Sequence, residues 1–291
     1  MKVLVLGSKG QLGCCLSDQF DSTEYELIYT SRKEMDISDF EAAKAKIIDI
    51  NPSVVVNASA YTAVDAAEGD EKTADLINNL AVANIANACN EVGCWLIHVS
   101  TDYVFDGNAN KPYRETDRTN PKSIYGVSKL NGEYAIKSSG CKYLIVRTAW
   151  VFSEYGNNFM KTMLRLGTER DELSIVGDQT GCPTYAQDIA KAIVRMLDYL
   201  EDESVIGVYH FCGSEECSWF QFGHEIFQQA GELGLSVPYS LKSISTAEYP
   251  TPAKRPGYSV LDTHKSLMVF GISPSDWRAG ILNVLRKLQV S

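Results

Sequence analysis

The stretch that decides the fold opens the chain and reads Lys2-Val3-Leu4-Val5-Leu6-Gly7-Ser8-Lys9-Gly10-Gln11-Leu12-Gly13. It joins a short apolar run, typical of a strand covered on both faces, to a GxxGxxG pattern. Glycines in such a loop permit a tight turn and let backbone N–H groups approach a pyrophosphate at the positive end of the following helix. The stretch therefore predicts a strand, a phosphate-binding loop and a helix over 11–20, although a plain strand-to-helix turn would also use these glycines.

Similar apolar runs continue through the first half of the chain and alternate with segments of helical periodicity. We expect buried strands at 26–29, 54–56, 95–99 and 143–146, and helices at 40–50, 74–91 and 128–137. Strands that are regularly separated by helices imply βαβ units, and right-handed crossovers make these a doubly wound parallel sheet. The predicted fold class is α/β, a Rossmann-type sheet with a smaller C-terminal α/β substrate lobe.

The second half of the chain is less regular. Helices are expected at 157–166, 186–199, 220–230 and 277–288, with one strand at 207–211. Six of the nine prolines lie at or after residue 183, in loops of the kind that often build a site on a rigid scaffold. We expect residues 1–150 to form an NAD(P)-binding Rossmann domain, to which segments near 182–212 return, and residues 151–291 to form mainly the substrate-binding lobe.

The composition excludes several classes of protein. Among 291 residues, 45% are hydrophobic, and 27 Lys and Arg stand against 37 Asp and Glu, a net charge of −10. This argues for a folded globular chain and against broad binding to nucleic acid or to an anionic membrane. No apolar run approaches the roughly 18 residues of a membrane span, and the first seven residues lack a secretory pattern, so we expect a cytoplasmic enzyme. The eight cysteines contain no CxxC and are expected to be free thiols rather than disulfides or zinc ligands.

The residues after the second predicted strand bear on the choice of nicotinamide cofactor. A carboxylate there would hold a ribose 2′-hydroxyl, whereas a basic group would accommodate a 2′-phosphate. The chain has Thr30-Ser31-Arg32-Lys33, which favours NADPH, while the neighbouring Glu34 leaves NADH possible. Arg32 and Lys33 could instead be solvated loop charges. Asp36 and Ile37 are candidates for the adenine edge.

A tyrosine and a lysine four residues apart form the candidate catalytic pair, Tyr125 and Lys129. On a helix both side chains lie on one face, and a nearby cation makes a phenol with a pKa near 10 useful as an acid at neutral pH. Thr101 follows a predicted buried strand at the sheet edge where such folds bind ligands, and its hydroxyl could bond to a substrate carbonyl. YxxxK also occurs by chance in helices. His98, within the same strand, is interpreted as a core histidine rather than a catalyst.

The glycine loop, the Ser100–Phe105 segment STDYVF and YxxxK, in this order, resemble the extended short-chain dehydrogenase/reductase superfamily. Longer segments over essentially the whole chain resemble the dTDP-4-dehydrorhamnose reductase family. These segments are 57–68, 100–105, 125–133, 147–151 and 249–256. The resemblance implies NAD(P)H-dependent reduction of the 4-keto group of dTDP-6-deoxy-L-lyxo-4-hexulose to dTDP-L-rhamnose.

The resemblance also implies roles for individual residues. Thr101, Tyr125 and Lys129 would be the catalytic triad. The candidate substrate-binding residues are Val64, Thr101, Asp102, Tyr103, Trp150 and Arg255. The candidate cofactor-binding residues are Gly7, Gly10, Gln11, Leu12, Gly13, Arg32, Asp36, Ile37, Ser59, Ala60, Tyr61, Thr62, Tyr125 and Lys129. Arg255 is assigned to the substrate diphosphate because a guanidinium suits bidentate phosphate contacts, although a surface ion pair is the alternative.

The chain departs from this family at one point. Some members hold a magnesium ion at a dimer interface with glutamates, where this chain has Cys14-Cys15 and Gln187, and residues 286–291 contain no acid. We therefore expect no magnesium, and a monomer or a weak homodimer. Two other functions stay open, another nucleotide-sugar reductase or epimerase and a noncatalytic NADP-binding regulatory subunit.

Both expected ligands are polyanionic nucleotides, so an acidic protein must collect positive potential locally. The expected sources are the helix N-terminus after Gly7, Arg32 with Lys33, Lys129, and Lys254 with Arg255.

Overall fold

A six-stranded parallel sheet forms the centre of the computed structural model, which describes residues 1–20 and 24–290. Its strands are β1 (Lys2–Leu6), β2 (Glu26–Thr30), β3 (Val54–Asn57), β4 (Trp95–Thr101), β5 (Lys142–Thr148) and β10 (Gly207–His210). They are ordered β10-β5-β4-β3-β1-β2, and all five neighbouring pairs are parallel. The Rossmann-type prediction is confirmed, and the strand order reverses between β1 and β3, where such sheets bind ligands.

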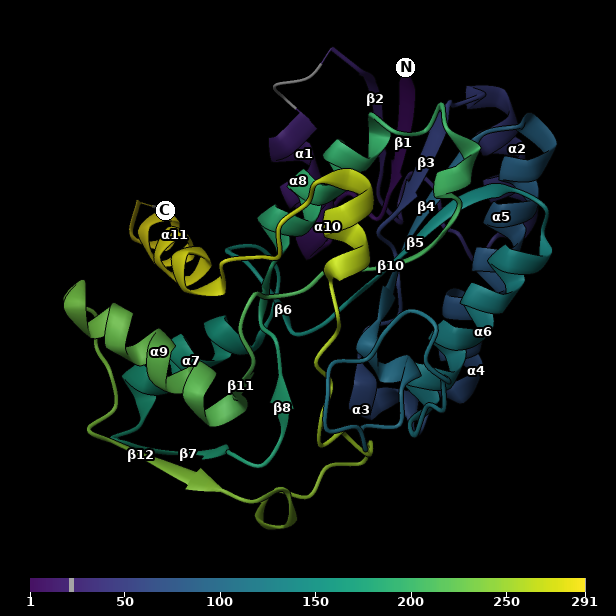
Figure 1. Cartoon of the computed structure of the whole chain (residues 1–291). Coiled ribbons are helices and arrows are strands. Elements are labelled where there is room, and N and C mark those ends of the chain that lie inside the picture. Colours follow the sequence, from purple (N-terminus) through teal and green to yellow (C-terminus); the bar gives the residue numbers. More distant parts are fainter. Residues whose placement is uncertain (21–23, 291) are drawn as a thin grey trace.

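Helices cover both faces of this sheet (Figure 1). On one face lie α1 (Gln11–Phe20) and α8 (Ala186–Leu197), and on the other lie α2 (Phe40–Ile50), α5 (Ala81–Val92) and α6 (Ile124–Ser138). Strand β1 is apolar from Val3 to Leu6 because both of its faces are buried. Val3 and Val5 pack into the core beneath α1 and α8, whereas Leu4 and Leu6 pack into the core beneath α2 and α5.

The helix predicted over 74–91 consists of three consecutive segments. Helix α4 (Glu71–Asp75) runs into a π-helical stretch (Leu76–Leu80) and then into α5. Asp70 caps the start by accepting from the N–H of Thr73, and Gly93 ends α5 with a left-handed φ of 72°. A short α3 (Val64–Ala67) precedes α4. The π-helical stretch brings Asn78 against α6, so this irregular turn lies directly behind the candidate catalytic helix.

The second lobe packs three helices around its own core on the left of Figure 1. These helices are α7 (Phe159–Glu169), α9 (Trp219–Glu232) and α11 (Trp277–Val290), and the core includes Phe152, Phe222 and Trp277. At the edge of this lobe β7 (Glu172–Val176) pairs in parallel with β12 (Ser240–Ile244). The sequence patterns did not predict β7 or β12, because β7 buries only two of its five residues and β12 buries none completely.

Several further short elements were also not predicted. They are β6 (Val151–Phe152), β8 (Thr180–Gly181), β9 (Thr184–Tyr185), β11 (Cys217–Ser218), α10 (His264–Phe270) and 3-10 turns at Asp102–Val104, Glu203–Val205 and Thr246–Glu248. After β9 the chain returns to the central sheet through α8 and β10. Across residues 1–20 and 24–290, no helix is long and apolar enough to cross a membrane.

Candidate active site

A cavity of about 960 Å³ opens at the carboxyl ends of the central strands and extends to the second lobe. Of the residues predicted to bind cofactor or substrate or to act in catalysis, all line this cavity except Gly13. Trp219 and Asn158, from the second lobe, also line it. A cavity bounded by both lobes can accommodate a dinucleotide and a second ligand side by side.

The glycine loop forms one wall of the cavity. Gly7 has φ 79°, and a Cβ there would lie 2.9 Å from the Cα of Ser59. A Cβ on Gly13 would lie 2.3 Å from the carbonyl oxygen of Gly7, so Gly13 lets α1 pack closely behind the loop without reaching the cavity. Close backbone approach at a helix N-terminus is the arrangement that binds a pyrophosphate, so the residues present fit a dinucleotide.

The far end of the cavity, beyond β2, contains Arg32, one of the two basic residues that bear on cofactor choice. Arg32 is exposed and pairs with Asp36, with Nε 3.1 Å from Oδ2. The Ser38 hydroxyl and N–H lower the pKa of Asp36, and Arg32 lowers it further. Glu34 accepts from the N–H of Ser31 at 2.7 Å and does not line the cavity.

The cations near the cavity differ in part from those predicted. Lys33 and Lys254 do not line it, whereas Lys9 of the glycine loop does. In the sequence Lys9 occupies one of the variable positions between Gly7 and Gly10. Its spacing follows the loop pattern and carries no separate signal, so its place at the cavity depends on how the loop turns.

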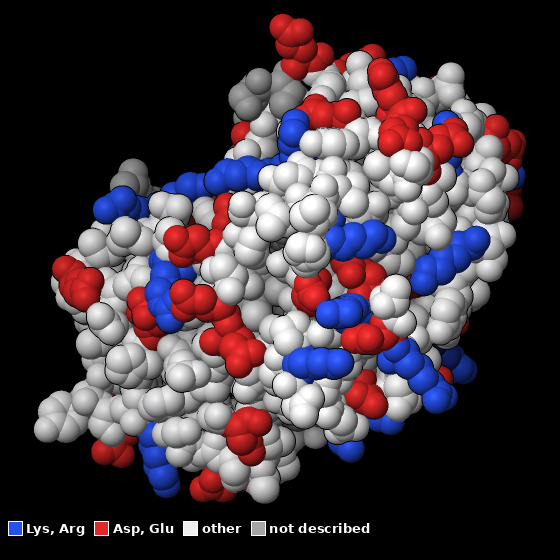
Figure 2. All heavy atoms as spheres, in the orientation of Figure 1, with Lys and Arg blue, Asp and Glu red and all other residues white. Residues whose placement is uncertain are grey.

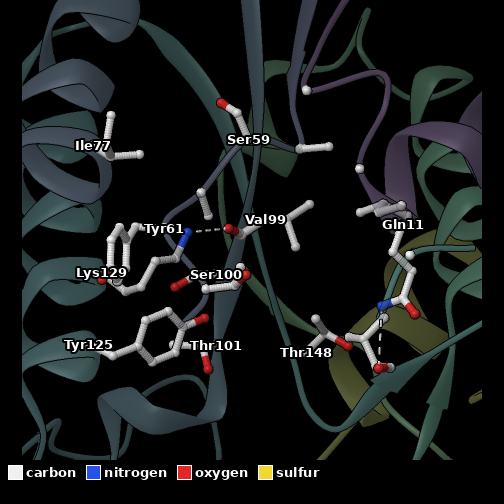
Figure 3. A pocket seen from close by; sticks show the side chains of 18 of the residues that line it. Gln11, Ser59, Tyr61, Ile77, Val99, Ser100, Thr101, Tyr125, Lys129 and Thr148 are labelled. Carbon is white, nitrogen blue, oxygen red and sulfur yellow. Dashed lines mark hydrogen bonds between the residues drawn. The ribbon is translucent and has the colours of Figure 1, made fainter. Parts of the chain in front are cut away.

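The candidate catalytic residues meet at the carboxyl end of β4 (Figure 3). Helix α6 begins at Ile124, four residues before the predicted start, because Ser123 caps it by accepting from the N–H of Gly126 at 3.1 Å. This early start places Tyr125 in the first turn and Lys129 one turn later on the same face. Thr101 is the last residue of β4 and lies beside the Tyr125 ring.

Burial shifts the pKa values of Tyr125 and Lys129 in opposite directions, so it favours the neutral phenol of the first and the neutral amine of the second. Removal from water raises the pKa of Tyr125 above its usual value, while a hydrogen bond with Thr101 opposes this shift. Burial lowers the pKa of Lys129 to about 8. The Lys129 Nζ donates to the carbonyl oxygen of Val99 at 2.7 Å and lies 3.2 Å from Nε2 of His98. The Tyr125 phenol therefore carries its proton at neutral pH and is able to donate it.

Asp102 is a buried carboxylate with one free oxygen. Its side chain is 2% exposed, Oδ1 accepts from the Thr101 hydroxyl at 3.0 Å, and Oδ2 has no hydrogen-bond partner. Burial raises its pKa to about 6. A buried acceptor without a partner is costly in the free protein and suits a ligand hydroxyl.

Arg255 reaches the cavity from the segment that follows β12. Its Nη2 pairs with Asp65 Oδ2 at 2.7 Å and its Nη1 lies 3.3 Å from the Tyr103 hydroxyl. Asp65 also accepts from the N–H of Ala253 at 3.3 Å, so it holds this segment against α3. The guanidinium is partly buried in the cavity wall, and in the free protein it has an acidic partner.

Two stacked indoles close the side of the cavity that faces the second lobe. The rings of Trp150 and Trp219 have centroids 3.5 Å apart at an interplanar angle of 8°. Trp150 adopts a left-handed φ of 47°, which is strained for a residue with a side chain. Trp219 was not predicted, because it begins α9 in the other lobe and no local pattern distinguishes it from a core aromatic residue.

The positions at which the resemblance places magnesium ligands do not fit that ion. Cys14 and Cys15 supply thiols, and Gln187 supplies an amide whose Oε1 is buried without a partner. Magnesium prefers oxygen ligands, chiefly carboxylates and water. Nearby, the Lys287 ammonium pairs with Glu154, and the described residues contain no cluster of three His, Cys, Asp or Glu that could hold a metal. Of the segment 286–291, Ser291 lies outside the described residues. The eight cysteines are free thiols.

Comparisons with known proteins agree with this geometry. The family model described as RmlD substrate binding domain matches residues 1–290. A dTDP-4-dehydrorhamnose reductase of Aggregatibacter actinomycetemcomitans is 41% identical over 288 residues, covering 97% of this chain and 98% of the relative. The crystal structure of a Clostridium acetobutylicum dTDP-4-dehydrorhamnose reductase superimposes with a TM-score of 0.92 at 38% identity, over 99% of this chain and 100% of that one. The Bacillus anthracis enzyme of that name, solved in complex with NADP, gives a TM-score of 0.91 at 36% identity, over 98% and 99% of the two chains. Because the match spans both lobes at this level of identity, the chain belongs to the dTDP-4-dehydrorhamnose reductase family.

Proposed function

We propose that this protein reduces the 4-keto group of dTDP-6-deoxy-L-lyxo-4-hexulose to give dTDP-L-rhamnose, with NADPH as the favoured reductant. The observation that carries the proposal is the meeting of Thr101, Tyr125 and Lys129 in one cavity with a glycine loop shaped for a dinucleotide. The cavity thus places a candidate proton donor beside a loop that fits a hydride-donating dinucleotide. Family membership narrows the substrate to the keto-sugar that the named relatives reduce.

The chain's own residues supply the proton and the polarisation. When bound, a reduced nicotinamide supplies the hydride to the substrate carbonyl carbon. Tyr125 donates its proton to the oxygen. The Thr101 hydroxyl, which donates to Asp102 Oδ1 in the free protein, would turn to donate to the same oxygen as negative charge develops. Lys129, as an ammonium, stabilises the phenolate that Tyr125 leaves behind.

The proposed cofactor residues follow the cavity from the glycine loop to the end of β2. Those assigned to the cofactor are Gly7, Gly10, Gln11, Leu12, Gly13, Arg32, Asp36, Ile37, Ser59, Ala60, Tyr61, Thr62, Tyr125 and Lys129, with Gly13 acting through packing. Lys9 and Arg32 supply positive charge suited to a 2′-phosphate. The NADP complex of the Bacillus anthracis relative supports NADPH over NADH.

The proposed substrate residues lie between β4 and the second lobe. They are Val64, Thr101, Asp102, Tyr103, Trp150 and Arg255. Arg255 would exchange its contact with Asp65 for the substrate diphosphate. We further propose that residues 1–150, with the returning segments near 182–212, form the cofactor domain, and that 151–291 form mainly the substrate lobe. We also propose that the protein is cytoplasmic, that it is a monomer or a weak homodimer, and that it binds no magnesium.

The function is tested by following NADPH and NADH oxidation with the keto-sugar generated in situ by the preceding enzymes. Stoichiometric consumption of NADPH and formation of dTDP-L-rhamnose are expected. An epimerase would convert the sugar without net oxidation of cofactor. A noncatalytic subunit would oxidise none with any keto-sugar, and either of these results would contradict the proposal.

The role of Tyr125 is tested by Tyr125→Phe, which removes the proton donor and leaves the ring. We expect kcat to fall by about 10²–10⁴-fold, while NADPH affinity measured by fluorescence titration stays within about twofold. Tyr134→Phe is the matched control, because Tyr134 lies on the same helix with half of its surface exposed and does not line the cavity. A Tyr125→Phe enzyme with near wild-type turnover would remove Tyr125 from the mechanism.

A further inference from the structure

A buried histidine connects the candidate catalytic lysine to the neighbouring strand. His98 in β4 and Asn57 at the end of β3 are both completely buried, and neither lines the cavity. Nδ1 of His98 lies 3.2 Å from Nδ2 of Asn57, and Nε2 of His98 lies 3.2 Å from Nζ of Lys129. The interpretation of His98 as a core histidine holds for its burial, but one of its ring nitrogens contacts the candidate catalytic machinery.

The orientation of the Asn57 amide is determined by its other contacts. Its Oδ1 accepts from the backbone N–H of Ser59 at 3.0 Å and from the Ser59 hydroxyl. A backbone N–H can only donate, so the amide oxygen must face Ser59 and the amide NH₂ must face His98. Asn57 therefore donates to Nδ1, and a neutral imidazole that accepts on Nδ1 carries its proton on Nε2.

This tautomer directs an N–H group at Lys129. An ammonium has only donors, so it faces the His98 N–H without forming a hydrogen bond. A neutral amine has a lone pair, and it can accept from Nε2 of His98 while it continues to donate to the Val99 carbonyl at 2.7 Å. We propose that Asn57 and His98 control the protonation of Lys129, with His98 held as the Nε2–H tautomer that stabilises the amine and disfavours the ammonium.

The other charged groups around Lys129 do not cancel the effect of His98 on its protonation. Glu133, one turn further along α6, favours the ammonium, but Arg147 of β5 neutralises it through two contacts of 2.9 and 2.7 Å. Tyr125 lies one turn earlier on α6, and the Asp102 carboxylate acts on Tyr125. The pKa of His98 is lowered well below its usual value by burial and then by Lys129, so the imidazole is neutral. The lowered pKa of Lys129 agrees with this arrangement.

The consequence for catalysis rests on the role proposed above for Lys129. After Tyr125 has given its proton to the product, the phenolate must recover one. When an N–H bond of the Lys129 ammonium breaks and the O–H bond of Tyr125 forms, the amine that is left accepts from His98. Lys129 then takes a new proton from water in the cavity that it lines. His98 is thus a positioning residue that acts through Lys129 and makes its proton available near neutral pH.

The first test reads the tautomer directly and requires no activity. Enzyme labelled with ¹⁵N at its four histidines is measured by long-range ¹H–¹⁵N NMR at about pH 7 and about pH 9. His210, also completely buried, serves as an internal control for which we expect the other tautomer. Its Nδ1 lies 3.1 Å from the Tyr113 carbonyl oxygen and must therefore donate. We expect a proton on Nε2 of His98 and on Nδ1 of His210. A proton on Nδ1 of His98 would overturn the proposal.

The second test follows the basic limb of the kcat/KM profile. His98→Gln can offer an amide oxygen to the ammonium, so the limb should move to higher pH by about one unit. Asn57→Asp replaces the NH₂ donor by an acceptor. An acceptor at this position favours the His98 tautomer with its proton on Nδ1, so the limb should again move to higher pH. His210→Gln removes a buried histidine from the same sheet and should leave the limb in place.

The double variant separates the tautomer from the added charge. Asn57→Asp should shift the limb less in the His98→Gln background than alone, because the imidazole transmits the change. Unchanged limbs in both single variants would contradict the proposal. If His98→Gln fails to fold, Asn57→Asp and the NMR result decide. A wild-type enzyme without reductase activity would refute the proposed function, and the NMR result would still decide the tautomer.

Discussion

At the scale of the residue, the pKa values of two aspartates that follow β4, Asp102 and Asp106, are shifted in opposite directions. Asp102 is buried with a free Oδ2, and its pKa is raised to about 6. The pKa of Asp106 is lowered, mainly by the Tyr113 hydroxyl and then by the N–H of Asn108. Folding therefore disfavours the charged form of the first carboxyl and favours that of the second.

The Asp102 pKa predicts how stability depends on pH. Because its folded value lies above the unfolded value near 3.9, the stability it contributes is complete below that pH and is lost as pH rises through about 6. Asp102→Asn should thus raise the free energy of unfolding near neutral pH by about 1–3 kcal/mol, less toward pH 4, and lower kcat/KM. The check is thermal and urea unfolding across this range. Asp106→Asn should destabilise instead, and equal effects of the two substitutions would contradict this account.

At the scale of the element, α6 is held in place by close backbone contacts at two glycines. A Cβ at Gly126 would lie 2.3 Å from the carbonyl oxygen of Tyr103, and one at Gly132 would lie 2.1 Å from that of Asn78 in the π-helical stretch. The Asn78 side chain also bonds to the Ser128 hydroxyl at 3.1 Å and to the backbone of Tyr61. The irregular turn thus links the catalytic helix to a loop that lines the cavity.

Gly132→Ala should therefore push α6 away from the π-helical stretch. We expect the free energy of unfolding to fall by about 1–3 kcal/mol, and kcat to fall as Tyr125 and Lys129 are displaced. Urea denaturation and steady-state kinetics measure the two effects. Gly69→Ala serves as the control, because a Cβ there would meet only the Ala66 carbonyl at 3.8 Å. A Gly132→Ala protein as stable as Gly69→Ala would show that the helix can shift without cost.

At the scale of the whole molecule, an acidic protein has to attract polyanionic ligands. Its net charge is −10, and Figure 2 shows acidic and basic side chains interspersed on the visible face. Positive charge in the cavity wall comes from Lys9, Arg32, Lys129 and Arg255. Binding therefore depends on local fields, which salt screens within about 8–10 Å at physiological ionic strength.

We expect the KM for NADPH to rise several-fold between about 20 mM and about 300 mM NaCl, with kcat changing less than about twofold. Arg32→Met should raise KM at low salt and flatten this dependence. Lys33→Met is the matched control, since Lys33 is the next residue but does not line the cavity. If the two variants behave alike, the effect belongs to overall charge and not to the cavity.

Much of the first lobe was predictable because each of its elements has a local pattern. The helices at 11–20 and 40–50 have the predicted bounds, and the six parallel strands match the predicted apolar runs to within a few residues. Strands β7 and β12 lacked such a signal, because they bury few side chains. Helix α6 begins at Ile124 and not at the predicted residue 128, because Ser123 caps its first turn.

The sequence by itself determined the Rossmann-type sheet, the glycine loop and the order of the catalytic motifs. These features depend on hydrophobic period, glycine spacing and local residue types, which are all local properties of the sequence. Only the tertiary structure decided that Trp219 stacks on Trp150, that Asp65 holds Arg255, and that Asn57 and His98 reach Lys129. These contacts join residues from separate strands, helices and lobes. Their geometry depends on how the elements pack, which no local pattern specifies.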